Sequence, residues 1–182
     1  MADMTTASPD SAASPSDELV DVVDENDRVL RSAPRSEVYR DNLLHRCVFV
    51  LVRDPQGRIF THRRTDTKVF APGAYDCFVG GVVGAGESYL EAAVREAEEE
   101  LGVSGIRTRP LFRFRYTDGE RFSWWSDVHE AEWDGPVSPQ AEEVAWHTWL
   151  TEDELADRLT TWEFVPDGRE AWRRYLELRT TG

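Results

Sequence analysis

Three glutamates spaced three and four residues apart, Glu96, Glu99 and Glu100, are the group in this chain most suited to chemistry. Spacings of three and four place side chains on one face of an α-helix, where like charges repel by about a few tenths of a kcal/mol per pair. Clusters of carboxylate oxygens bind hard cations such as Mg²⁺ or Mn²⁺, which would offset that repulsion. A bare glutamate triplet in an acidic protein is also typical of an ordinary solvated helix, so the neighbouring sequence decides between the two.

That neighbouring sequence predicts a glycine-rich loop followed by a well-delimited helix. Glycine permits the sharp bends and close backbone approach that residues 80–86 would need. Ser88 with Glu91 forms a capping-box pattern, so the helix should begin at Tyr89, and Gly102 supplies a left-handed end. The side chains expected on its buried face are Leu90, Ala93, Val94, Ala97 and Leu101.

Hydrophobic periodicity and turn residues predict the remaining elements. The expected strands are 18–24, 28–30, 47–53, 58–63, 75–81, 106–116, 122–133 and 144–150, and the other expected helices are 36–44, 151–159 and 166–178. Strands before and after one central helix, with terminal helices, favour an α/β/α sandwich on a mixed β-sheet. Residues 1–16, rich in Ala, Ser and Pro, are expected to be a disordered tail, and residues 17–182 a single domain.

The glycine loop and helix together resemble the Nudix box. Its pattern is Gly, five residues, Glu, seven residues, Arg-Glu, an aliphatic residue, any residue, Glu-Glu, any residue, Gly and an aliphatic residue. The positions in register are Gly81, Glu87, Arg95, Glu96, Glu99, Glu100, Gly102 and Val103, with Ala97 where a larger aliphatic residue is more usual. The resemblance covers roughly residue 18 to the C-terminus and implies the Nudix form of the α/β/α sandwich.

What the resemblance implies chemically is hydrolysis of a diphosphate linkage with Mg²⁺ or Mn²⁺ bound by the box glutamates. Glu96, Glu99 and Glu100 are then the metal ligands, and Glu96 and Glu99 are also catalytic. Glu87 is expected to pair with Arg95, or to contact a metal ligand without touching the metal and so orient that ligand.

Other segments supply candidates for substrate binding and proton transfer. Arg63, Arg64 and Lys68 are candidates for binding the diphosphate, although each arginine alone also fits a solvated strand end. Glu143 lies where some Nudix enzymes place an additional metal ligand or general base. Trp124 and Trp125 point to opposite faces of one strand, so one of them is expected to face the cleft.

The loop backbone has its own expected role, because Gly80 and Gly81 would bring the main chain close to metal and substrate.

A narrower resemblance extends beyond the box. Residues 44–46 and 63–73 resemble the subgroup of isopentenyl-diphosphate isomerase and its hydrolase-like bacterial relatives, with agreeing spacings. In the isomerase, residues at the positions of Arg64 and Lys68 bind diphosphate and a histidine at His45 binds metal. The alternative for His45 is a structural histidine near the start of a strand.

The isomerase pattern breaks at its reactive positions. The essential cysteine would fall at Gly80 and a metal-binding histidine at Val82, while Cys77 lies three residues early. Three hypotheses follow: a Nudix hydrolase, an isomerase-like enzyme, and a noncatalytic diphosphate-binding module. The complete set of box glutamates favours the hydrolase.

Composition and charge restrict the kinds of molecule that this chain is expected to bind. A formal net charge of −14 argues against nonspecific binding to nucleic acid or to an anionic membrane, so a small-molecule diphosphate substrate is expected. The chain has no long apolar run and its N-terminus lacks signal-peptide features, so a cytoplasmic location is expected. The sequence leaves a homodimer open.

Overall fold

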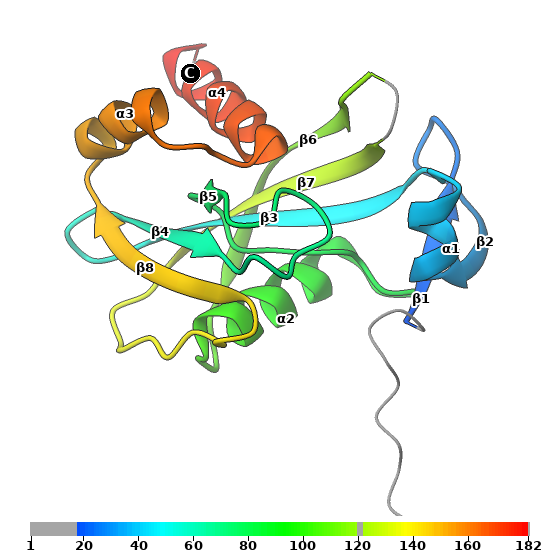
Figure 1. Cartoon of the computed structure of the whole chain (residues 1–182), viewed down its shortest axis with the longest axis horizontal. Helices are drawn as coiled ribbons and strands as arrows, with labels where there is room; N and C mark the ends of the chain where they lie inside the picture. Colours follow the sequence, from blue (N-terminus) through cyan, green and yellow to red (C-terminus); the bar gives the residue numbers. More distant parts are fainter. Residues whose placement is uncertain (1–17, 120–121, 182) are drawn as a thin grey trace, which may run out of the picture.

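Within residues 18–119 and 122–181, which this computed structural model describes, a six-stranded mixed β-sheet forms the centre of the fold (Figure 1). The strands are β3 (His45–Arg53), β4 (Ile59–Arg64), β5 (Tyr75–Asp76), β6 (Thr108–Thr117), β7 (Ser123–Glu132) and β8 (Val144–Leu150). Their order is β5-β4-β3-β7-β6, with β8 also paired to β4. β3 and β7 are parallel and the other pairs are antiparallel, as the mixed sheet predicts. The expected tail, residues 1–16, lies outside the described residues.

Alternation along β3 explains why helices cover both faces of this sheet. Val48, Val50 and Val52 pack in the cluster that contains α2 (Tyr89–Leu101), whereas Phe49 and Leu51 belong to the opposite cluster. That second cluster includes side chains of α3 (Glu152–Thr161) and α4 (Pro166–Thr181). Figure 1 shows α2 on one side of the sheet and α3 and α4 on the other. The predicted α/β/α sandwich is confirmed.

The N-terminal segment forms a small unit beside this sandwich. β1 (Leu19–Val23) and β2 (Val29–Pro34) form an antiparallel hairpin that leads into α1 (Arg35–Arg40). Asp27, in the turn of the hairpin, accepts from Arg46 at 2.6 Å and from Arg113 at 2.7 Å. The turn is therefore held against β3 and β6 by charge-assisted contacts.

α2 begins and ends at the residues that its capping pattern predicts. The Ser88 hydroxyl accepts from the Glu91 backbone, and the Glu91 carboxylate accepts from the Ser88 backbone at 2.9 Å. Gly102 ends the helix with φ +63°, in the left-handed region that favours glycine. A Cβ on Gly102 would lie 2.0 Å from the Ser138 carbonyl oxygen, so the following loop packs directly against this end.

Three expectations about local structure were wrong. Leu90 is 52% exposed, because the face of α2 that meets the sheet is centred on Ala93, Ala97 and Leu101, and Ala92 takes the buried place instead. The segment after Asp76 is not a continuous strand and makes isolated bridges to β3. The expected helix 36–44 ends at Arg40, since Asn42 has φ +49°.

The junction of β5 with α4 joins two distant parts of the chain. The backbone N–H of Tyr75 donates to the Glu163 carbonyl at 2.8 Å, and the Tyr75 carbonyl accepts from the backbone N–H of Val165 at 2.8 Å. A Cβ on Gly168 would lie 2.5 Å from Oδ1 of Asp76, so the first turn of α4 closes directly over that carboxylate. No helix in the described ranges is long and apolar enough to span a bilayer.

Candidate active site

Arg95 organises the carboxylates of the box. Its guanidinium makes a two-pronged contact with Glu87, at 2.8 and 2.9 Å, and donates to Glu96 at 2.8 Å. A longer contact of 3.4 Å reaches Glu99, and a further one of 3.2 Å reaches the Val82 carbonyl. The expected pairing of Glu87 with Arg95 is present. Because Arg95 donates to side chains and to the preceding loop, it fixes the helix and loop relative to each other.

Burial makes two of the three predicted metal ligands electrostatically unusual. Glu100 is only 4% exposed, and its Oε2 has no hydrogen-bond partner. Burial, together with the nearby charge of Glu96, raises the pKa of Glu100 to about 8, and burial also raises the pKa of Glu96. The expectation that all three glutamates lie off the buried face is therefore wrong for Glu100.

These residues fit a divalent cation. A buried carboxylate oxygen without a donor is costly, and a cation supplies the missing partner. Among the described residues, no three acidic, His or Cys side chains already converge as a ligand group. Glu96, Glu99 and Glu100 nevertheless line one cavity of about 310 Å³. Gly81 leaves room for this arrangement, since a Cβ there would lie 2.6 Å from Glu96.

Basic side chains line the same cavity. Lys68 forms an ion pair with Glu143, and both line the cavity together with Arg35. Burial lowers the pKa of Lys68, and the nearby guanidinium of Arg64 lowers it further. Acidic and basic side chains thus line one cavity, which suits an anionic group bound both by basic side chains and by a metal ion.

The two adjacent arginines of β4 have different surroundings. Arg64 lines the cavity that adjoins the carboxylates, donates to the Phe70 carbonyl at 3.2 Å, and leaves its buried Nε without a partner. Arg63 instead pairs with Asp66 at 2.8 Å and lines none of the cavities described in this section. Successive side chains of a strand point to opposite faces, so only Arg64 is brought to the site.

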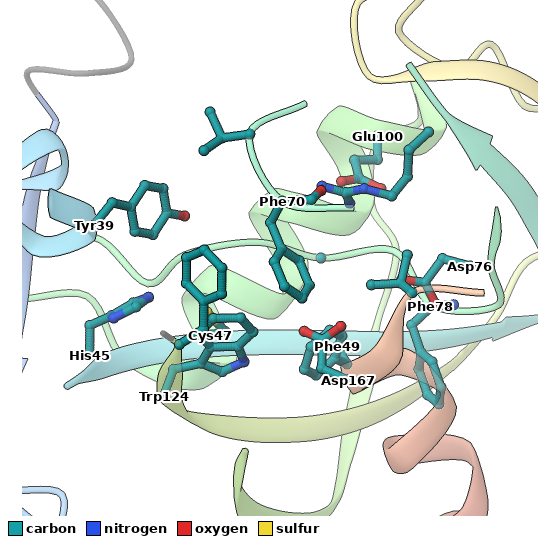
Figure 2. Close-up of a pocket in the computed structure, with 15 residues that line it drawn as sticks. Tyr39, His45, Cys47, Phe49, Phe70, Asp76, Phe78, Glu100, Trp124 and Asp167 are labelled. Carbon is teal, nitrogen blue, oxygen red and sulfur yellow. Dashed lines mark hydrogen bonds between the residues drawn. The ribbon is translucent and has the colours of Figure 1, made fainter. Parts of the chain in front are cut away.

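His45 and Trp124 line a second, largely apolar cavity beside the carboxylates (Figure 2). The Nδ1 atom of His45 lies 2.8 Å from the Leu43 carbonyl, and its ring packs between Tyr39 and Trp124. Burial lowers the pKa of His45 to about 4, so the ring is neutral near pH 7. His45 does not line the cavity of the glutamates, which favours the structural alternative. Of the two tryptophans, Trp124 faces this cavity.

Several residues that line the two cavities escape the sequence patterns. Glu18, Arg35 and Gln140 reach the carboxylate cavity from segments that are remote in sequence from the box. Asp76 and Asp167 are buried in the wall of the second cavity. An acidic residue within the apolar run 74–79 was a usable indication for Asp76, whereas nothing in sequence pairs it with Asp167.

Comparison with known proteins identifies the family. A model described as the NUDIX domain matches residues 43–170. An uncharacterized Nudix hydrolase of Streptomyces coelicolor is 60% identical over 166 residues, covering 91% of this chain and 92% of that protein. The uncharacterized Nudix hydrolase YfcD of Escherichia coli is 39% identical over 162 residues, covering 89% and 88%. The crystal structure of DR0079 from Deinococcus radiodurans has a TM-score of 0.73 at 31% identity, covering 86% and 98%.

These relatives match nearly the whole chain, and the box glutamates line one cavity together with the basic side chains. The chain belongs to the Nudix family and is a Nudix hydrolase, of the general class that cleaves diphosphate linkages.

Proposed function

We propose that this enzyme is a Mg²⁺- or Mn²⁺-dependent hydrolase that cleaves the diphosphate linkage of a nucleoside-diphosphate-linked or related small molecule. The observation that carries the proposal is that one cavity is lined both by Glu96, Glu99 and Glu100 and by the basic side chains of Arg35 and Lys68. A diphosphate needs cationic partners, and the net charge of −14 means that they must be local.

Each residue has a definite part in the proposed reaction. Glu96, Glu99 and Glu100 would hold the metal, which when bound neutralises phosphate oxygens and lowers the pKa of a coordinated water. Arg64 and Lys68 orient the diphosphate, while Gly80 and Gly81 allow close approach of the backbone. Arg95 keeps Glu96 and Glu99 in position through its bonds.

A general base must accept the proton of the attacking water. Glu143 suits this role because it lines the same cavity, paired with Lys68. A diphosphate that binds Lys68 competes with Glu143 for that ammonium group and so frees the carboxylate to accept a proton. Glu99, half-exposed on α2, is the other candidate for this role.

We also propose that the chain is a hydrolase-like relative of isopentenyl-diphosphate isomerase rather than an isomerase. A Cβ on Gly80 would lie 2.0 Å from the Val48 carbonyl oxygen, so this backbone has no room for the cysteine that isomerisation requires. Gly80 also has φ +154°, which side chains rarely adopt. Val82, at the histidine position, is buried and offers no metal ligand.

A substrate screen tests this function directly. The purified protein is incubated with nucleoside diphosphate sugars, dinucleoside polyphosphates, dinucleotides, coenzyme A, nucleoside triphosphates and isopentenyl diphosphate, with Mg²⁺, with Mn²⁺ or with a chelator. Metal-dependent phosphate or phosphomonoester release is expected, and the Glu99→Gln/Glu100→Gln double variant is the inactive control. Absence of hydrolysis across the screen would favour a noncatalytic diphosphate-binding module, and formation of dimethylallyl diphosphate would favour the isomerase.

The proposed setting is the cytoplasm, with a small-molecule substrate and no nucleic acid or membrane partner. The acidic net charge supports this part of the proposal. Light scattering on the purified chain would decide between a monomer and a homodimer.

A further inference from the structure

The second cavity adjoins the proposed site of phosphate cleavage. Gly80 and Glu100 line both this cavity and the one that holds the box glutamates. Its volume is about 90 Å³, and much of its wall is aromatic. Phe70 packs edge-on against Phe122 and Trp124, with ring centroids 5.2 Å apart in both pairs. A group attached to a bound diphosphate would meet this cavity directly.

The wall of this cavity is not uniformly apolar, however. Four buried polar atoms without hydrogen-bond partners belong to residues that line it: His45 Nε2, Arg64 Nε, Glu100 Oε2 and Trp124 Nε1. His45, Glu100 and Trp124 are each no more than 4% exposed. Glu100 Oε2 is the atom that a cation would satisfy. The other three belong to residues of one cavity wall, and because buried polar atoms are usually satisfied by protein, ordered water or ligand, they indicate a built hydrogen-bonding site.

Two carboxyl groups complete the polar part of the wall. Figure 2 shows the side chains of Asp76 and Asp167 directed toward the same space as Glu100 and Phe70. Asp76 accepts from the Phe78 backbone at 3.0 Å, and Asp167 accepts from the Gly168 backbone at 3.0 Å. Asp76 and Asp167 are each 4% exposed, so both carboxyl groups belong to the buried polar part of this wall.

We propose that this cavity binds the non-phosphate part of the substrate, and that this part is a small, planar, amino-substituted nitrogen heterocycle joined to the diphosphate by a short linker. The inference rests on the proposed function, since it names the substrate class of the same site. Aromatic walls favour a flat ring by stacking and edge-on packing. The indole and guanidinium N–H groups match ring nitrogens, and the carboxyl oxygens match an amino group.

The pKa values of Asp76 and Asp167 support the match between the cavity and an amino-substituted ring. Burial, with the charge of Asp167, raises the pKa of Asp76 to about 7, and burial raises the pKa of Asp167 to about 6. Near neutral pH the two carboxyl groups are therefore partly protonated, so together they can donate as well as accept. The edge of an aminopyrimidine, with an amino donor and a ring-nitrogen acceptor, matches such a pair.

A hydrocarbon chain fits this wall less well. An alkyl group of similar size would fill the cavity but would leave the polar atoms without partners, and sites built for hydrogen bonding discriminate strongly against such analogues. The shared residues Gly80 and Glu100 show that the two cavities adjoin, and from this we infer a one-carbon linker rather than a ribose.

Three diphosphate esters separate these possibilities. The diphosphate of 4-aminopyrimidin-5-ylmethanol carries the proposed ring, benzyl diphosphate has the same linker and shape without polar atoms, and isopentenyl diphosphate is the hydrocarbon case. We expect kcat/KM for the aminopyrimidine ester to exceed that for the benzyl ester at least tenfold. Cytidine diphosphate is a fourth arm, in which an aminopyrimidine ring is joined through a ribose.

Substitutions in the cavity wall test whether this wall causes the preference for the aminopyrimidine ester over the benzyl ester. Asp167→Asn and Trp124→Phe should each reduce the aminopyrimidine-to-benzyl ratio at least fivefold. Asp167→Asn changes a polar group at constant side-chain size, whereas Trp124→Phe removes the indole N–H together with part of the ring. Trp172→Phe is the matched control, since Trp172 is equally buried but stacks on Tyr175 in α4 and does not line this cavity. It should keep the wild-type ratio.

Binding of the free alcohols separates this inference from the proposed function. Titration of 4-aminopyrimidin-5-ylmethanol into the wild type, followed by NMR, requires neither metal nor hydrolysis. Binding that is weakened in Asp167→Asn would support the ring site even if the protein hydrolysed no diphosphate. Equal rates on the aminopyrimidine and benzyl esters, a preference for isopentenyl diphosphate, or a ratio unchanged in both variants would overturn the ring assignment, and a preference for cytidine diphosphate would overturn the short linker.

Discussion

At the scale of single residues, Glu100 shows how function conflicts with stability in this protein. A glutamate in the core, with one oxygen unpaired, is the kind of group that folding alone disfavours. Its spacing from Glu96 is visible in the sequence, but its burial is not, because burial depends on how deeply α2 packs against β3. The helix therefore carries an acid that becomes favourable only when a cation is bound.

Replacing that acid with its neutral isostere should have opposite effects on stability and on catalysis. Glu100→Gln should increase the free energy of unfolding above about pH 8 in the presence of a chelator, because there the carboxyl is ionised and the substitution removes a buried unpaired charge. The same change, or Glu99→Gln, should reduce the rate of hydrolysis by about 100-fold or more through loss of a metal ligand. Urea unfolding and initial rates measure the two effects. A fully active Glu99→Gln/Glu100→Gln protein would contradict the metal assignment.

The basic wall of the cavity yields a second expectation at this scale. Lys68→Ala should weaken diphosphate binding by about 1–3 kcal/mol, the size of a lost hydrogen bond to a charged group. Arg64→Ala should also raise KM, whereas Arg63→Ala should leave it near the wild-type value because Arg63 pairs with Asp66 away from the cavity. Steady-state kinetics on the three variants tests this, and an unchanged KM in Lys68→Ala would remove the phosphate contact.

At the scale of elements, α2 with its preceding loop was the part of the chain most open to prediction. The capping residues Ser88 and Glu91, the stop at Gly102 and the pair Glu87–Arg95 depend on neighbours within one or two turns. The exposure of Leu90 was not predictable in this way. Periodicity gives the relative angle of side chains, but the edge of the sheet decides which of them it covers.

Arg95 should be the residue on which this element most depends. Arg95→Ala removes a cation bonded to Glu87, Glu96 and Glu99, so the partly buried carboxylates lose their main partner. Both the melting temperature and the affinity for Mn²⁺ should fall. Calorimetry and metal titration measure these quantities, with Arg107→Ala as a control on an arginine outside the box. Unchanged values for both would show that the Arg95 contacts contribute little.

At the scale of the whole molecule, the contacts that complete the cavities join segments far apart in sequence. Asp76 on β5 meets the first turn of α4, and Glu143 reaches Lys68 across the sheet edge. Most strands and helices were predictable because the hydrophobic period and the turn residues of each element lie within its own stretch of sequence. Arg35 and Asp167 were not predictable as site residues, because their positions depend on the pairing of elements rather than on any motif.

The Asp76–Asp167 junction predicts how stability depends on pH. The pKa of Asp76 is about 7 in the folded protein and about 3.9 in an unfolded chain, so between those values the folded state binds more protons. Stability contributed by the protonated acid is present below about pH 4 and is lost as the pH rises toward 7.

Asp76→Asn removes this titration while keeping the acceptor for Phe78. Relative to the wild type, the variant should gain stability between about pH 4 and pH 7 and then level off, since each unit of pKa shift corresponds to about 1.4 kcal/mol. Chemical unfolding across that range, in the presence of a chelator, measures the difference. The exposed Asp134→Asn is the control, and a pH-independent difference for Asp76→Asn would contradict the prediction.

The N-terminal hairpin has a consequence for how such an enzyme acquires a new substrate. The family match begins at residue 43, yet Glu18 and Arg35 line the cavity from the segment before it, which the contacts of Asp27 hold in place. Residues 18–40 therefore contribute to the phosphate pocket from outside the matched stretch. Substitutions among them would reshape this pocket while every residue of the box stays unchanged, so specificity and chemistry rest on separate parts of the chain.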